Sequence, residues 1–590
     1  MAGFLEIIVV SVILLSVSST KSNASEHRYQ KGDSVPLYAN KVSPFHNPSE
    51  TYAYYSLPFC RPDPLIEKKG TLGEVLNGDR LVSAPYKLDF LIEREYQVLC
   101  RKNLTREEAT QFRTAISQDY FWEMYYDDLP LWGFIGEVYH ARKANTEEHK
   151  YFMYTNIIFE IFYCEDYVIE IKARIDTSRL AELTKDREVD VEFSFTAVWK
   201  EINVSFEKRM NKYMQSARLK RHYRVHQFSI ANALVAVFLL IGCLVKIYVR
   251  VLRKDFYKYI DEEQLDDNLE ETGWKVLHGD VFRYPKHKSL LAAAIGSGTQ
   301  LFVMVVGILM FGFIGVFHPY DRGVLKVALV MMYVITYGIS GFTAVSFYRQ
   351  LEGIHWMRNL LLTGCLFCGP FALTFCFINA VAATYGTTTA LPLGTIVMIF
   401  LIWMLLACPL LLFGAKSGKA INLEFQAPCH TTKCPREIPA LRWYRGVLPQ
   451  VAFAGSLPFN VIYIELSYIF ATIWGHRVYT LYGTLCIVFI LTIIITALVS
   501  IIMTYIQLAA EDHRWWWRSF VCGGSSALYV YGYCFYYYFQ TSDMRGFMQT
   551  SFFFGYMACI SYGLFLMLGS VGFCASLFFV RYIYGSIKCE

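Results

Sequence analysis

Charged residues are scarce in this chain, and the motifs of enzymes and of nucleic-acid-binding proteins are missing from it. Asp, Glu, Lys and Arg make up 18% of its 590 residues, against about 25% in an average soluble protein. No basic cluster interleaves with aromatic residues, which argues against a nucleic-acid surface. No Ser-His-Asp order, phosphate-binding glycine loop or His-Glu-x-x-His motif stands out, so we expect neither catalysis nor a cofactor.

Long apolar runs take the place of the missing charge. Hydrophobic residues make up 54% of the chain, and eight apolar runs follow one another between residues 290 and 580. Each run approaches or exceeds the roughly 20 residues that an α-helix needs to cross about 30 Å of hydrocarbon. A helix satisfies its backbone hydrogen bonds within one segment, and no alternating strand pattern indicates a barrel. The runs are residues 290–317, 324–347, 360–385, 391–415, 447–474, 478–508, 519–539 and 549–580.

A ninth apolar run, residues 227–249, precedes the other eight. The predicted fold class is therefore a polytopic α-helical membrane protein with nine transmembrane helices, in which a loop at 250–289 joins the first helix to an eight-helix bundle at 290–580. Small residues recur within the spans, as in Gly-Ile-Ser-Gly at 338–341, and allow close helix packing. We expect them to pack inside the bundle, with a groove for another protein's helix as the alternative.

The N-terminal part has a different character. Residues 1–24 contain an apolar stretch at 7–17 of signal-peptide length, too short to span a bilayer; a buried N-terminal helix is the alternative. Residues 25–226 have ordinary polarity and no spanning run, which predicts one soluble domain. Aromatic and β-branched runs at 151–162 and 167–175 predict a β-hairpin. Together with an alternating strand at 189–198 and a capping box that opens a helix over 105–117, they predict a mainly-β fold.

This domain contains three cysteines and two glycosylation sequons. Behind a signal peptide the environment is oxidising, so a disulfide is expected. From their order in the chain we pair Cys60 with Cys100 and leave Cys164 at the hairpin turn; such a loop adds about 4 kcal/mol of stability. Asn103 and Asn203 begin the sequons, which fits a lumenal location.

The loops differ strongly in basic residues. Twenty Lys and Arg residues lie on the face that carries the 250–289 loop and residues 581–590, whereas the opposite short loops contain only Arg322, Arg477 and Arg545. The positive-inside rule therefore places the N-terminal domain in the lumen and the C-terminal tail in the cytosol.

Glu465 is the most informative ionisable residue, because it lies inside the predicted span 447–474. A carboxylate there costs several kcal/mol unless it is partnered, neutralised or in contact with water. Pro458 and Asn460 lie just upstream, and a proline removes one helix hydrogen bond. A broken helix beside a carboxylate would suit a transporter site; a protonated Glu465 bonded to a neighbouring helix, with Pro458 as a structural kink, is favoured.

Cys429, His430 and Cys434 lie close together in a cytosolic loop. A structural zinc site uses four ligands in paired spacing, and this stretch offers one loose cysteine pair and one histidine. Reduced cysteines without metal are therefore the favoured interpretation.

Residues 579–590 form the end of the chain, which we expect to be cytosolic and flexible, and to be read by coat proteins as an extended peptide. Its end, Lys588-Cys589-Glu590, carries one positive charge followed by two carboxylates, from the Glu590 side chain and the C-terminus. This pattern is compatible with a coat-binding address.

Six stretches of the chain form a specific pattern. They are Leu-Pro-Phe-Cys at 57–60, Gly-Asp-Arg at 78–80, Tyr-Tyr-Asp-Asp-Leu-Pro at 125–130, Asp-Phe at 255–256, Gly-Trp-Lys-Val-Leu-His-Gly-Asp-Val-Phe-Arg at 273–283 and Ala-Glu-Asp-His-Arg-Trp-Trp-Trp-Arg at 510–518. With nine spans behind a lumenal domain, the chain resembles the nonaspanins, that is, the transmembrane nine superfamily or endomembrane protein 70 family. The resemblance covers residues 29–590, nearly the whole mature chain.

The resemblance implies a non-catalytic Golgi and endosomal membrane protein that sorts or delivers client membrane proteins. It implies that Lys588, Cys589 and Glu590 form a lysine-x-acidic Golgi retention signal for the COPI coat. It also implies an export signal, read by the coat that leaves the endoplasmic reticulum. That segment consists of Phe579, Val580, Arg581, Tyr582, Ile583 and Tyr584. The alternative function is an ion- or solute-coupled transporter that uses Glu465.

Overall fold

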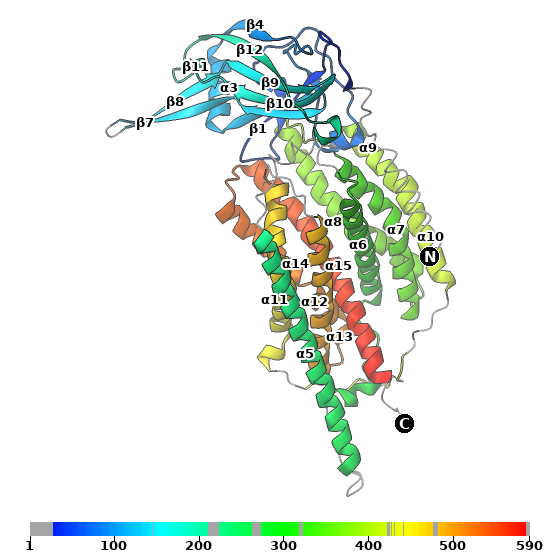
Figure 1. Ribbon diagram of the computed structural model, residues 1–590. Coiled ribbons are helices and arrows are strands. Elements are labelled where there is room, and N and C mark those ends of the chain that lie inside the picture. The colour runs from blue at the N-terminus through cyan, green and yellow to red at the C-terminus, as the bar shows by residue number, and fades with distance from the viewer. Residues whose placement is uncertain are drawn as a thin grey trace.

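The computed structural model describes residues 27–143, 146–209, 223–261, 273–317, 323–421, 442–475 and 482–585, together with parts of 425–439. A β-rich N-terminal domain sits on one end of a long helical bundle (Figure 1). The predicted signal peptide and the retention residues Lys588, Cys589 and Glu590 lie outside the described residues.

Three antiparallel or mixed sheets build the N-terminal domain. The first has the order β2 (Tyr52–Ala53), β1 (Leu37–Pro44), β5 (Tyr120–Tyr126) and β6 (Leu129–Phe134), and β3 (Val82–Ser83) also pairs with β1. The second has the order β10 (Tyr167–Ile175), β9 (Asn156–Cys164), β12 (Val189–Glu201) and β4 (Arg94–Leu104). The third has the order β11 (Leu180–Glu182), β8 (Thr146–Tyr154) and β7 (Gly136–Lys143). The helices are α2 (Leu72–Leu76) and α3 (Arg106–Ser117).

The mainly-β prediction is confirmed, with one boundary wrong. The β9–β10 hairpin, the β12 strand and the capped helix α3 all form. The run at 151–162, however, is two strands: the chain leaves β8 at Tyr154 and enters β9, in another sheet, at Asn156. The pattern of apolar residues indicates which side chains are buried but does not indicate which sheet a strand joins. The break between the two strands at Thr155 could therefore not be predicted from the sequence.

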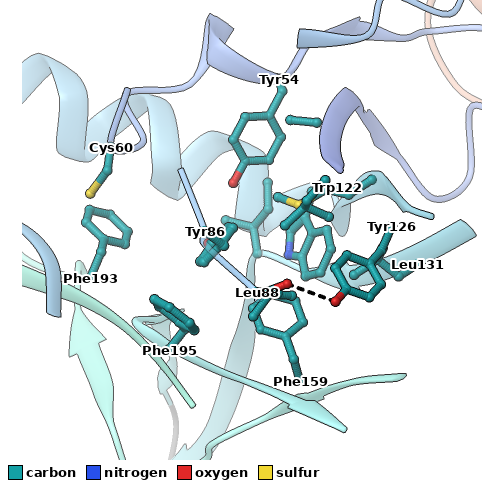
Figure 2. Close-up of a cluster of buried hydrophobic side chains, with 14 of the residues drawn as sticks. Tyr54, Cys60, Tyr86, Leu88, Trp122, Tyr126, Leu131, Phe159, Phe193 and Phe195 are labelled. Atoms are coloured by element: carbon teal, nitrogen blue, oxygen red, sulfur yellow. Dashed lines mark hydrogen bonds between the residues drawn. The ribbon is translucent and has the colours of Figure 1, made fainter. Parts of the chain in front are cut away.

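Aromatic side chains fill the core of this domain. Figure 2 shows Tyr54, Trp122, Tyr126 and Phe159 among the side chains of this core, and all four are almost fully buried. The Tyr126 hydroxyl donates a hydrogen bond of 2.9 Å to the Leu88 carbonyl. This bond satisfies the one polar group of the buried tyrosine side chain. At the edge of the core a disulfide joins Cys60 to Cys100, with Cα atoms 6.2 Å apart, while Cys164 is a half-buried free thiol.

Eight helices in the described residues are long and apolar enough to cross a membrane. Seven of them are the apolar part of α5 (Tyr223–Asp261), then α6 (Lys288–Ile314), α7 (Val324–Gln350), α8 (Trp356–Thr384), α11 (Val447–Ile473), α12 (Tyr482–Leu508) and α15 (Phe547–Gly585). The other one, between α8 and α11, is a continuous helix made of α9 (Leu393–Ile402), a π-helical turn (Trp403–Ala407) and α10 (Cys408–Ala420). The remaining span, which is the eighth in chain order, is interrupted. It consists of α13 (Trp515–Gly524) and α14 (Ser526–Tyr536), which meet at Ser525, followed by a π-helical turn (Tyr537–Thr541).

Small residues bring the helices of the bundle into close contact, as the favoured interpretation expects. A Cβ atom on Gly341 of α7 would clash with the Leu411 carbonyl of α10, and one on Gly298 of α6 would clash with the Leu566 carbonyl of α15. Since these glycines face other helices of the same chain, their role is internal packing.

The N-terminal domain is fastened to loops at its end of the bundle. The Thr388 amide, in the α8–α9 loop, donates to the Thr51 carbonyl at 2.8 Å, and the two hydroxyls lie 2.6 Å apart. Asn47 exchanges two hydrogen bonds with the backbone of Arg545, before α15. The Lys326 ammonium group, on α7, donates to the Leu76 carbonyl at 3.0 Å. Three separate loops or helix ends therefore hold one domain.

Candidate intramembrane site and C-terminal segment

Glu465 is buried inside the bundle. It lies in the second half of α11, and its side chain is 1% exposed. Pro458 is also buried and lies seven residues earlier, on the same helix face. The alternative of a helix broken at Pro458 is wrong, because α11 continues from Val447 to Ile473 through Pro458. Asn460 is exposed, whereas Glu465 is buried, and five residues along α11 separate them onto different helix faces, so Asn460 does not belong to the site.

A histidine from another helix is one partner of this carboxylate. The His226 Nδ1 atom, near the start of α5, lies 2.5 Å from the Glu465 Oε1 atom, and the two side chains are 6% and 1% exposed. The Tyr468 ring, one turn beyond Glu465, packs on the imidazole with centroids 4.7 Å apart. The pair links the first span, which leads directly from the N-terminal domain, to the sixth.

Sequence reasoning missed His226 because the predicted span starts one residue later, at 227. The available signal was an ionisable residue at the very edge of an apolar run. A buried carboxylate needs such a partner, and imidazole is the side chain that exchanges a proton between pH 5 and 8. The arrangement is therefore able to hold a proton between the two side chains.

Polar side chains continue along α12 toward the opposite end of the bundle. Thr492 and Thr496 are buried, but each hydroxyl donates to a carbonyl four residues earlier in the same helix. Beyond the end of α12, the buried Arg518 guanidinium lies 3.1 Å from the Asp512 carboxylate. Because each of these two hydroxyls bonds within its own helix, Thr492 and Thr496 do not link α12 to a neighbouring helix.

No metal site forms in the described residues, where no group of three or more His, Cys, Asp and Glu side chains is arranged to hold an ion. Cys429 is buried and Cys434 is exposed, and neither is part of a disulfide. His430 lies outside the described residues.

The C-terminal segment 579–584 is a packed helix, which makes the expectation of an extended, accessible peptide over these residues wrong. The helix α15 continues to Gly585, and Val580 and Tyr584 are fully buried. The Tyr584 hydroxyl donates to the Trp274 carbonyl at 2.6 Å, and its ring packs edge-on against the Trp274 ring. These residues are packed because the 273–283 stretch folds against the end of α15. Among residues 579–584, Tyr582 alone is largely exposed, at 65%.

Both predicted glycosylation residues are exposed. Asn103 lies near the end of β4, and Asn203 follows β12. Each side chain therefore has room for a glycan, and their use stays a prediction.

Comparison with known proteins agrees with this architecture. Residues 51–547 match the family Endomembrane protein 70. Transmembrane 9 superfamily member 4 from Arabidopsis thaliana is 60% identical, over 99% of this chain and 98% of that protein. Transmembrane 9 superfamily member 1 from Bos taurus is 39% identical, over 95% and 94%. A Dictyostelium discoideum protein named "Putative phagocytic receptor 1b" is 39% identical, over 100% and 99%. No solved structure matches the chain.

Proposed function

Because the chain belongs to the transmembrane 9 superfamily, we propose that it is a non-catalytic sorting protein of Golgi and endosomal membranes. Its N-terminal domain faces the lumen, its C-terminal residues face the cytosol, and it carries client membrane proteins between compartments. The relative named as a phagocytic receptor supports a role in handling membrane proteins and their cargo.

The observation that carries this proposal is the fastening of the N-terminal domain to three parts of the bundle, at Thr388, Arg545 and Lys326. A domain held in this way keeps a fixed orientation above the membrane, next to the helices that a client would contact. The end of α15 lies at the opposite end of the bundle (Figure 1). One molecule thus presents a client-facing module on one side and a coat-facing segment on the other.

Retention in the Golgi by the COPI coat is proposed for Lys588, Cys589 and Glu590. We expect Lys588→Ala and Glu590→Ala to move the full-length protein to later compartments, because each removes one charge that the coat reads. Cys589→Ala is the matched control, since it changes the same tail and keeps both charges. Unchanged Golgi residence of Lys588→Ala and Glu590→Ala in immunofluorescence would refute the retention signal.

The export signal over 579–584 is proposed for the exposed part of that helix. Tyr582 is accessible, whereas Val580 and Tyr584 are buried. Tyr582→Ala should therefore slow export from the endoplasmic reticulum without lowering stability. Normal export of Tyr582→Ala would remove this segment from the coat-binding surface.

The His226–Glu465 pair favours a second candidate, a proton-coupled transporter. It supplies the partner in another span that such a site needs, although the self-bonded threonines of α12 offer no continuous path. Reconstituted protein is expected to show no proton-coupled flux if sorting is the function. A flux that is lost in Glu465→Gln, and kept in the exposed control Glu437→Gln, would establish the transporter instead.

A further inference from the structure

A groove on the N-terminal domain lies outside everything assigned so far. It has a volume of about 600 Å³ and opens between the β7–β8 hairpin and the loop that follows β1. Phe45, Phe134 and Tyr151 form its apolar wall, and Asp119 and Glu137 place two carboxylates on it. The lining contains no lysine or arginine among the residues that the structure describes.

The groove lies at the edge of the membrane. The chain that carries Phe45 continues into His46, whose ring lies 3.5 Å from Asp119 and 3.8 Å from Asp543, in the loop between α14 and α15. Phe539 and Phe547 flank that loop and are 70% and 62% exposed. Exposed aromatic side chains at the ends of spans are typical of the membrane–water interface, so the groove opens just above that interface.

An aromatic shelf, formed by Phe45, Phe121, Trp132 and Phe134, extends from the groove. Neighbouring rings in this set have centroids 5.6 to 6.2 Å apart. Trp132 lies on β6, an edge strand of its sheet, and is 54% exposed. A large exposed tryptophan supported by other rings is typical of a protein-binding hot spot.

The charges of the groove select among possible occupants. The lining also contains His140 and His149, and His46 lies beside Asp119 and Asp543. With neutral histidines, the carboxylates of Asp119, Glu137 and Asp543 leave the site acidic, so it attracts Lys or Arg and repels anionic lipid headgroups. The exposed aromatic faces attract the same cations. A peptide with basic and apolar residues therefore matches the groove and the shelf better than a membrane surface does.

We propose that the groove and the aromatic shelf bind the lumenal segment next to the membrane of another membrane protein, where that segment combines Lys or Arg with apolar side chains. The inference rests on the proposed sorting function for its biological meaning, and it names the chemistry of the client. A client helix in the bilayer beside α14 would bring such a segment directly to the groove.

Direct binding tests the inference with full-length protein in phosphatidylcholine nanodiscs. The probe is a short fluorescent peptide of Lys, Leu, Ser and one Trp, compared with the same peptide carrying Glu in place of each Lys. We expect the Lys peptide to bind, and the Asp119→Asn, Glu137→Gln double variant and Trp132→Ala each to weaken binding about tenfold. Asp190→Asn, at an exposed carboxylate on β12, is the matched control and should bind normally.

Equal binding of the Lys and Glu peptides, or unchanged affinity of the groove variants, would overturn the inference. Brominated phosphatidylcholine provides a second readout: if it quenches a fluorescence component that Trp132→Phe removes, the shelf lies in the lipid and the inference is wrong. None of these measurements involves Lys588 or Golgi residence. Failure of the peptide to bind and failure of the retention signal are therefore separate results.

Discussion

Removal of His226 from its pair with Glu465 should destabilise the bundle strongly. The two side chains are 6% and 1% exposed and lie 2.5 Å apart. Taking one partner from a buried charged pair costs about 3–5 kcal/mol, because the other charge stays buried with one interaction fewer. We expect a loss of about 3 kcal/mol for His226→Leu, at the lower end of this range.

A double-mutant cycle separates this effect from lost packing. Replacement of both partners by apolar residues is often close to neutral, so His226→Leu, Glu465→Leu should be more stable than His226→Leu alone. Reversible unfolding in mixed micelles, followed by tryptophan fluorescence, measures each free energy of unfolding. His355→Leu, at an exposed histidine before α8, is the control and should change it by less than about 0.5 kcal/mol.

The reasoning would be refuted if His226→Leu lay within about 0.5 kcal/mol of the unmodified protein, or if the single losses simply added in the double variant. Either result would mean that the two side chains do not interact in the folded protein. The pair would then carry neither the structural link between α5 and α11 nor a proton site.

Three further predictions concern the N-terminal domain. Gly323→Ala should loosen its attachment and increase protease cleavage between domain and bundle, because Gly323 has φ of 76° and its new Cβ would meet the Gly73 carbonyl; unchanged cleavage would contradict this. Cys100→Ala should lower the unfolding free energy by about 4 kcal/mol, from the 40-residue separation that the disulfide closes, and a loss below about 1 kcal/mol would contradict it. Burial would raise the pKa of Asp79, but the Lys41 charge and hydrogen bonds from Asn40 and Asn77 outweigh it and lower that pKa below 3.8. The stability due to this depressed pKa is fully present above the ordinary pKa of 3.8 and is lost as pH falls through the lower pKa of the folded protein. The destabilisation caused by Lys41→Met should therefore be constant from about pH 5 to 8 and shrink only below about pH 4 in thermal melts.

The sequence predicts what depends on local patterns. Nine apolar runs indicate nine spans, and the capping box at Thr105 indicates helix α3 at its observed start. The interruption at Ser525 falls in a Gly-Gly-Ser-Ser stretch, where weak helix propensity was visible but the position of the break was not.

Features that depend on distant contacts could not be predicted. His226 and Glu465 are 239 residues apart, and only the packing of α5 on α11 brings them together. Tyr584 is buried because the Trp274 region, 310 residues earlier, folds over the end of α15. Pro458 failed as a helix breaker because a proline removes one backbone hydrogen bond, and packing in the bundle keeps α11 continuous across that loss.

The arrangement of the two ends of the chain is tested most directly by protease protection in sealed microsomes. The measurement uses full-length protein with one epitope in the β7–β8 hairpin and another after Glu590. Nine spans predict that protease removes the C-terminal epitope at once, while the hairpin epitope is cleaved only after detergent opens the vesicles. Protection of both epitopes, or loss of both before detergent, would place the two ends on the same side and contradict the account.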